Sequence, residues 1–384
     1  MISKGMAIDL ESRAAAVRAL HAGVPFALYC LPEEEHARFI AARECRHGSD
    51  SSPDRCPDRE YGRDKNCDCF DISPWLGRFG SRISIPAELT AADVLKLPQQ
   101  HNEQQTHTFY PGISEEEYCR RVARMAERCR RRDGKTVYSR VLAGVNPDLD
   151  IAAAAEELFD RFPGTFRFLY YTPETGCWLG ASPETLLDAD TDRGTFATVA
   201  FAGTRPADTA NQPWDEKNLC ENRFVADFFE EKFASLGLPY SISRPVTVDY
   251  GPVQHLCRDI SGTLGAPVSR IIDAINPTPA LCGTPSGEAI ADIGEFEPQP
   301  RLCYGGFVAV ASGSRYRAFV NLRCARIAPD GHFNLYAGGG ITALSDPRAE
   351  FRETAAKASV LLSILENVHG FPTGFPKTPK TGGV

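Results

Sequence analysis

Several features that would assign this chain to a particular class are missing from its 384 residues. No apolar run approaches the roughly 20 residues that a membrane-spanning helix needs. The N-terminal segment Met1–Leu20 lacks the apolar stretch of a signal peptide. Positive charge is not in excess, because 42 Lys and Arg face 50 Asp and Glu. We therefore predict a cytoplasmic protein that neither spans a membrane nor binds nucleic acid.

Two common ligand-binding motifs are also absent. The 13 Cys form no C-x₂-C pair, and no G-x-G-x-x-G follows a predicted strand, so the pattern indicates neither a zinc ribbon nor a dinucleotide fold. A polar segment near 43–71 contains five possible zinc ligands, namely Cys45, His47, Cys56, Cys67 and Cys69. Their spacing is irregular, and we interpret the segment as a surface insertion that binds no zinc.

The remaining sequence has the composition of a folded protein, with 42% apolar residues. Ser114 and Glu117 form a capping box that starts an Arg-rich helix, which we interpret as a solvated outer face. Helices are expected near 6–22, 33–43, 114–132 and 151–161 and from Asp215 onward. Strands are expected near 25–31, 78–85, 135–142, 166–172, 177–180, 196–202, 307–311, 318–325 and 332–336.

One stretch near the C-terminus combines several features of a ligand site. Gly338–Gly340 is expected to form a turn in which backbone N–H groups can approach a ligand closely. Ser345–Pro347 is typical of a helix start. Glu350, Glu353 and Lys357 then fall at i, i+3 and i+7, on one helix face. This arrangement suits a metal and an anion, and the alternative is a solvated helix face with an i,i+4 ion pair.

Other chemically capable residues are scattered along the chain. Lys135 opens an apolar strand, Glu184 stands in a tight turn, and Arg323 falls in an apolar strand where it would need an anionic partner. His255 lies in an apolar context, which is more often that of a hydrogen-bonded core histidine than of a ligand. Glutamates without His or Cys companions favour Mg²⁺ over zinc. A lysine and a separate glutamate can serve as base and acid on one substrate.

From about Ser114 to Ile364 the sequence resembles the chorismate-utilising enzyme family. The matching motifs, in order, are K-T-V-Y-S-R, G-A-S-P-E-T-L, A-G-T-R-P, D-E-K-N-L-C-E-N, C-R-D-I-S-G-T-L, N-P-T-P-A-L-C-G-T-P, R-L-C-Y-G-G, L-R-C-A, and A-G-G-G-I with E-F-R-E-T-A-A-K. The family includes isochorismate and salicylate synthases, anthranilate synthase component I and aminodeoxychorismate synthase component I. Where this chain has A-G-G-G, the family usually has A-G-A-G.

Two positions separate the subgroups of this family. The resemblance implies Gln at the position of Lys135 in ammonia-using anthranilate synthases, and Lys at the position of Ala202 in aminodeoxychorismate synthases. Lys135 with Ala202 is the combination of the water-using members. We therefore predict a menaquinone-pathway isochorismate synthase, with salicylate synthase as the alternative. An aminating enzyme with a glutaminase partner and a non-catalytic chorismate-binding protein are less favoured.

The resemblance also implies a role for each candidate residue. Lys135 would take a proton from the water that attacks C2 of chorismate, and Glu184, with a raised pKa, would protonate the departing C4 hydroxyl. Glu221 and Glu353 would hold Mg²⁺, the expected cofactor. The substrate-binding residues would be Thr204, His255, Tyr304, Arg323, Gly338, Gly339 and Lys357.

The fold implied by the family is α+β: two antiparallel sheets stack as a sandwich, helices cover the outside, and the active site lies in a cleft between the halves. Residues 1–110 would be a divergent N-terminal part of the same fold, including the insertion near 43–71. Residues 111–369 would form the chorismate-binding region, and 370–384 a disordered tail. We expect a monomer without an obligatory amidotransferase subunit.

Overall fold

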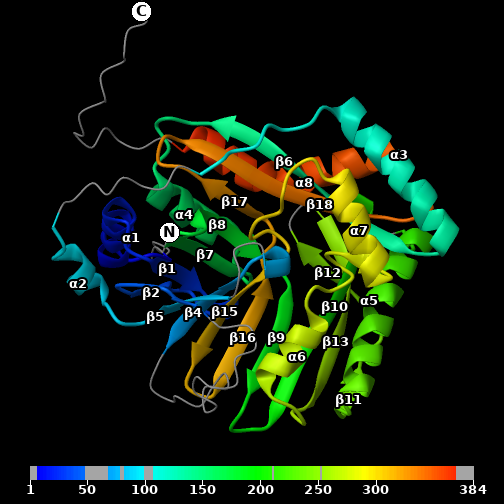
Figure 1. Cartoon of the computed structure of the whole chain (residues 1–384), viewed down its shortest axis with the longest axis horizontal. Coiled ribbons are helices and arrows are strands. Elements are labelled where there is room, and N and C mark those ends of the chain that lie inside the picture. The colour runs from blue at the N-terminus through cyan, green and yellow to red at the C-terminus, as the bar shows by residue number, and fades with distance from the viewer. Residues whose placement is uncertain are drawn as a thin grey trace, which may run out of the picture.

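The structure is a computed structural model that describes residues 7–47, 68–77, 82–98, 107–209, 212–250 and 253–368 (Figure 1). Its described residues form two antiparallel sheets with helices on their outer faces, so the predicted α+β sandwich is confirmed. None of the helices in these ranges is long and apolar enough to cross a membrane. Residues 48–67, which make up most of the proposed insertion, and the tail from 369 onward lie outside the described residues.

The first sheet has the strand order β14-β6-β18-β17-β8-β7-β1-β2. Its strands are β1 (Phe26–Cys30), β2 (Arg38–Ala41), β6 (Lys135–Val145), β7 (Phe166–Thr172), β8 (Gly176–Ser182), β14 (Gly283–Thr284), β17 (Cys324–Ile327) and β18 (His332–Ile341). Long pairing between β6 and β18 runs from Thr136 opposite Ile341 to Val145 opposite His332. This ladder brings Lys135 close to the glycines of β18.

The second sheet has the order β11-β13-β10-β9-β16-β15-β4-β5-β3, with β12 also paired to β13. Its strands are β3 (Arg46–His47), β4 (Cys69–Ser73), β5 (Ile83–Pro86), β9 (Thr185–Asp190), β10 (Thr195–Pro206), β11 (Tyr240–Ile242), β12 (Val246–Tyr250), β13 (Val253–Thr263), β15 (Phe307–Ser312) and β16 (Arg315–Val320). Strands that precede residue 110 therefore join both sheets. The division of the chain at 110 stays a prediction.

The helices are α1 (Leu10–Ala22), α2 (Ala91–Leu95), α3 (Glu115–Arg132), α4 (Ile151–Arg161), α5 (Glu216–Ser235), α6 (Val268–Ile275), α7 (Ser286–Phe296) and α8 (Pro347–Asn367). Helices α1, α4 and α8 lie on the first sheet, and α5 and α6 lie on the second (Figure 1). Their apolar residues belong to the cores of these sheets. Arginines of α3 pair with acidic residues of α3 and α7, as a solvated outer face predicts.

Strand alternation explains the core between the two sheets. In β7, Phe166, Phe168 and Tyr170 point between the sheets, whereas Leu169 and Tyr171 face the helices. Phe166 stacks on Phe319 of the opposite sheet with ring centroids 4.2 Å apart. Aromatic rings from both sheets therefore hold the sandwich closed.

Three sequence-based predictions of local structure are wrong. The helix expected at 33–43 contains β2 instead, because Phe39 packs against Phe26 and the segment pairs with β1. The strand expected at 318–325 is two strands, β16 and β17, which lie in different sheets. The glycine turn at 338–340 is part of β18, since these residues pair with Val137–Ser139 of β6.

Candidate active site

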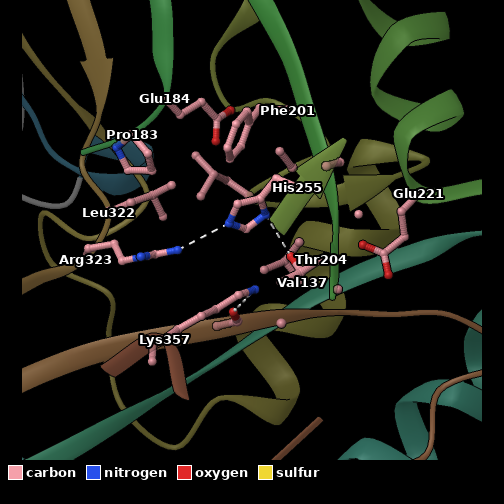
Figure 2. A pocket seen from close by; sticks show the side chains of 18 of the residues that line it. Val137, Pro183, Glu184, Phe201, Thr204, Glu221, His255, Leu322, Arg323 and Lys357 are labelled. Carbon is pink, nitrogen blue, oxygen red and sulfur yellow. Dashed lines mark hydrogen bonds between the residues drawn. The ribbon is translucent and has the colours of Figure 1, made fainter. Parts of the chain in front are cut away.

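A pocket lies between the two sheets and contains most of the predicted site residues (Figure 2). Its lining residues are Lys135, Val137, Pro183, Glu184, Phe201, Ala202, Gly203, Thr204, Glu221, His255, Ala280, Leu281, Tyr304, Leu322, Arg323, Tyr336, Ala337, Gly338, Gly339, Gly340 and Lys357. Every site residue predicted from sequence is in this set except Glu353. The structure thus brings together residues that the sequence separates widely, and their individual roles remain predictions.

Two crossovers between the sheets carry Glu184 and Arg323 into the pocket. The chain passes from β8 of the first sheet to β9 of the second through Glu184, and returns from β16 to β17 through Arg323. The crossovers run side by side, because Val320 N–H donates to the Glu184 carbonyl and Ala181 N–H donates to the Arg323 carbonyl. Both side chains therefore lie between the sheets, where the chain crosses from one sheet to the other.

Arg323 has left-handed backbone geometry, with φ +46°. Such a conformation is uncommon for a residue other than glycine and often marks a functional position. It redirects the chain between the sheets, which explains why a continuous strand through Arg323 was a wrong prediction. The guanidinium NH2 lies 3.3 Å from His255 Nε2.

A hydrogen-bonded series links Arg323, His255 and Thr204 (Figure 2). Arginine can only donate, so His255 Nε2 accepts and Nδ1 carries the proton. Nδ1 then donates to Thr204 Oγ1, 3.0 Å away, and the threonine hydroxyl keeps its own proton for donation. Burial, followed by the positive charges of Arg323 and Lys357, holds the pKa of His255 well below its usual value. His255 is therefore a neutral hydrogen-bonding residue.

A β-bulge in β10 sets this series in place. The register between β10 and β13 shifts between Phe201 and Thr204, and Thr204 then pairs with His255. Gly203 within the bulge has φ +88°, and a Cβ there would lie 2.9 Å from the Asn218 carbonyl oxygen. Asn218 of α5 also accepts the Thr204 backbone N–H through its side chain at 2.7 Å. Asn218 at the start of α5 therefore contacts the bulge directly and stabilises it.

Lys135 and Glu184 are both buried in the pocket, with 2% and 3% of their surfaces exposed. Lys135 Nζ lies 3.3 Å from Glu221 Oε2. Burial raises the pKa of Glu184 to about 8, although the charges of Lys135 and Lys357 oppose the shift. A carboxyl group that keeps its proton near neutrality can act as a general acid.

Behind the pocket, carboxylates and lysines of α5 and α8 form a compact cluster. Lys217 Nζ lies 3.0 Å from Glu221 Oε1 and 2.9 Å from Glu350 Oε1. Glu353 Oε1 pairs with Lys357 at 2.7 Å. Burial acts to raise the pKa of Glu221, but the charges of Lys135 and Lys217 outweigh it and lower the pKa to about 2. Glu221 is therefore a permanently charged carboxylate.

Glu350 was noted in the sequence beside Glu353 and Lys357 but was given no role. It is 2% exposed, and its Oε2 atom has no hydrogen-bond partner. Burial raises the pKa of Glu350 to about 7, the positive charge of Lys217 opposes this shift, and the carboxylates Glu353 and Glu221 add to it. Its place on the same helix face as Glu353 and Lys357 was visible in the sequence, but the burial that distinguishes it was not.

The acidic cluster fits a divalent cation by two observations. The Lys217 ammonium bridges Glu221 and Glu350, so a positive charge already lies between these carboxylates, and the unpartnered oxygen of Glu350 is available as a further donor. Carboxylate oxygens are the ligands that Mg²⁺ prefers. In the described residues no three Asp, Glu, His or Cys side chains are arranged to share a metal in this conformation. Glu353 stands beside Lys357, outside the pocket lining.

The glycines of β18 form one wall of the pocket, called here the glycine floor. A side chain on Gly338 or Gly340 would collide with other residues of the pocket. A Cβ on Gly340 would lie 2.6 Å from Lys135 Cε and 2.8 Å from Glu221 Oε2. A Cβ on Gly338 would lie 2.7 Å from the Tyr304 hydroxyl. These glycines therefore provide space for neighbouring groups, whereas the predicted turn geometry is absent.

We expect Gly340→Ala to reduce turnover of the natural substrate by roughly 10²-fold, because it displaces Lys135 and Glu221. Steady-state kinetics together with circular dichroism would separate this effect from misfolding. Gly294→Ala is the matched control, since a Cβ on this helical glycine meets nothing within 4 Å. The control should be active and slightly more stable. Equal activity of both variants would contradict the proposed role of the glycine floor.

Apolar side chains complete the walls of the pocket, including Val137, Phe201, Leu281, Leu322 and Tyr336. Cationic groups enter at separate points, from Arg323 and Lys357. The pocket therefore suits a small, partly apolar molecule that carries anionic groups. A model of the family described as chorismate binding enzyme matches residues 76–363.

The chain belongs to the chorismate-binding enzyme family. Among its relatives is the isochorismate synthase EntC of Escherichia coli, 29% identical over 248 residues that cover 60% of this chain and 62% of EntC. Anthranilate synthase component 1 of Streptomyces coelicolor is 30% identical over 311 residues, covering 76% of this chain and 59% of that protein. The chain thus spans less than two-thirds of the length of these curated relatives.

The fold of this family member matches a solved structure over nearly its full length. The menaquinone-specific isochorismate synthase MenF of Escherichia coli aligns with a TM-score of 0.72 and 20% identity, covering 93% of this chain and 91% of MenF. At this identity the similarity establishes the fold alone. The match includes regions on both sides of residue 110, in line with strands from the N-terminal part in both sheets.

Proposed function

We propose that this protein is an isochorismate synthase that converts chorismate to isochorismate. The observation that carries the proposal is the pairing, in one buried pocket, of Lys135 with a Glu184 whose pKa is raised to about 8. This supplies a base and a protonated acid at the same substrate. Similarity to EntC supports the same reaction.

In the proposed reaction water replaces a hydroxyl group across the diene of the ring. For this step Lys135 must be the uncharged amine, which removes a proton from water as the water oxygen bonds to C2 of chorismate. The two ring double bonds shift, the C4–O bond breaks, and Glu184 donates its proton so that water leaves. One water enters and one departs, so substrate and product are isomers. Lys135 has gained a proton at the end of the reaction, and Glu184 has lost one.

The other pocket residues bind and orient the substrate in this proposal. Arg323 and Tyr304 contact the carboxylate of the enolpyruvyl group, since a guanidinium matches a carboxylate in geometry. Thr204, oriented by His255, donates its hydroxyl proton to a substrate oxygen. Backbone N–H groups at Gly338 and Gly339 and the Lys357 ammonium complete the anion-binding surface.

Mg²⁺ would be held by Glu221 and Glu353, with Glu350 as an additional donor, and would offset the charge of the ring carboxylate. The proposal has further parts that stay predictions. They are a role in menaquinone biosynthesis, a cytoplasmic monomer, and independence from nucleic acid and from a glutaminase subunit.

Incubation of purified protein with chorismate and Mg²⁺, followed by chromatography of the products, tests the reaction. We expect a mixture of chorismate and isochorismate without pyruvate, and no conversion after addition of a chelator. Salicylate with an equal amount of pyruvate would identify a salicylate synthase instead. Anthranilate in the presence of ammonium would contradict the assignment of Lys135 and Ala202 to a water-using enzyme.

A further inference from the structure

Lys217 is a half-buried lysine for which the reaction provides no role. It lies in the first turn of α5 and is paired at i,i+4 with Glu221. Its Nζ atom is 3.0 Å from Glu221 Oε1 and 2.9 Å from Glu350 Oε1, so one ammonium joins carboxylates of two different helices. Lys217 therefore ties α5 to α8 at the back of the pocket.

The fold makes a positive charge necessary at this point. Asp215 caps α5 and Asp346 caps α8, and carboxylates of both helices, Glu221 and Glu350, lie within 3.0 Å of one ammonium. Both glutamates are largely buried, at 6% and 2% exposure. Buried carboxylates need a counter-charge, since their desolvation is otherwise strongly unfavourable. Lys217 supplies that charge.

We propose that Lys217 is a displaceable counter-ion, which competes with the divalent cation for Glu221 and Glu350. The ammonium lies against one carboxylate oxygen of Glu221 and one of Glu350, and it would repel a cation that bound the same two groups. This inference rests on the metal role in the proposed function and adds to it. Cation binding then requires that the Lys217 side chain leave the space between the two glutamates.

The surroundings of Lys217 allow this movement. Its side chain is 19% exposed, whereas that of Lys135, which contacts the same Glu221, is 2% exposed. A lysine has a flexible stem and a strongly hydrated head, so it can turn outward to water without breaking other structure. Lys217 can therefore move away from the carboxylates into water, whereas Lys135 is enclosed by the pocket and cannot.

Competition predicts that removing the ammonium strengthens cation binding. After chelator treatment and without chorismate, wild-type protein and Lys217→Met are titrated with Mn²⁺ or Mg²⁺ by calorimetry. We expect the variant to bind at least about tenfold more tightly. Lys232→Met is the matched control, because it removes one positive charge from the same helix at a pair with Glu231. The control should bind like wild type, and equal or weaker binding by Lys217→Met would overturn the proposal.

A measurement on the wild-type protein covers the possibility that the variant does not fold. Lysine acylation followed by peptide mass spectrometry reports the accessibility of Lys217 with and without Mn²⁺. We expect Mn²⁺ to increase its labelling several-fold, and unchanged or decreased labelling would refute displacement. Failure of all proteins to bind a divalent cation would remove the metal from the proposed function as well. A product other than isochorismate would leave the competition intact.

Discussion

Lys135→Ala is expected to lower the rate of chorismate conversion by about 10²–10⁴-fold while chorismate still binds. Lys135 is 2% exposed and faces the same pocket as Glu184. Without its amine, no group at this position can accept the proton of the attacking water. The loss should appear in kcat, measured by chromatography of products, with substrate affinity measured separately by calorimetry.

Two further variants make this result interpretable. Lys135→Gln keeps a hydrogen-bond donor toward Glu221 but has no basic amine, so it should be as inactive as the alanine variant. Lys96→Ala removes a lysine with 78% of its side chain exposed and should retain wild-type activity. Full activity of Lys135→Ala would show that another group is the base.

Glu184→Gln is expected to lose activity on the same scale and, at the same time, to stabilise the fold near neutral pH. The pKa of Glu184 is about 8 in the folded protein, compared with about 4.3 for an unfolded chain. Between these values the folded state binds the proton and the unfolded state releases it. Stability therefore falls as pH rises from about 4.3 to about 8, by linkage.

The glutamine variant lacks this titration, so its stability advantage over wild type should be absent below pH 4 and grow up to about pH 8. Urea unfolding at several pH values measures the difference, with Glu231→Gln, at an exposed side chain, as the control. In wild type, kcat should decline as pH rises through the pKa of Glu184, about 8. A stability difference independent of pH would contradict a buried, protonated Glu184.

Local signals in the sequence were enough for the helices that matter to the site. Ser114 caps α3 through the Glu117 N–H, and Asp346 caps α8 through the Ala349 N–H. The helix face shared by Glu350, Glu353 and Lys357 follows from periodicity alone. These features depend on residues a few positions apart, which is why sequence reasoning finds them.

The pairing of strands could not be predicted from such local signals. Gly338–Gly340 resembles a turn, yet it is held in β18 by hydrogen bonds to a segment about 200 positions earlier, Val137–Ser139. β2 is likewise a strand because β1 lies beside it. Tertiary partners override local preference in both cases.

By itself, the sequence determined the family, the residue types of the site and the capped helices, because motifs and caps depend on nearby positions. Only the tertiary structure decided how these residues are arranged. The paired crossovers bring Glu184 and Arg323 between the sheets, and burial raises the pKa of Glu184. The meeting of α5 and α8 places Lys217 between Glu221 and Glu350. Burial and charge pairing arise from segments distant in the chain, so no local pattern could specify them.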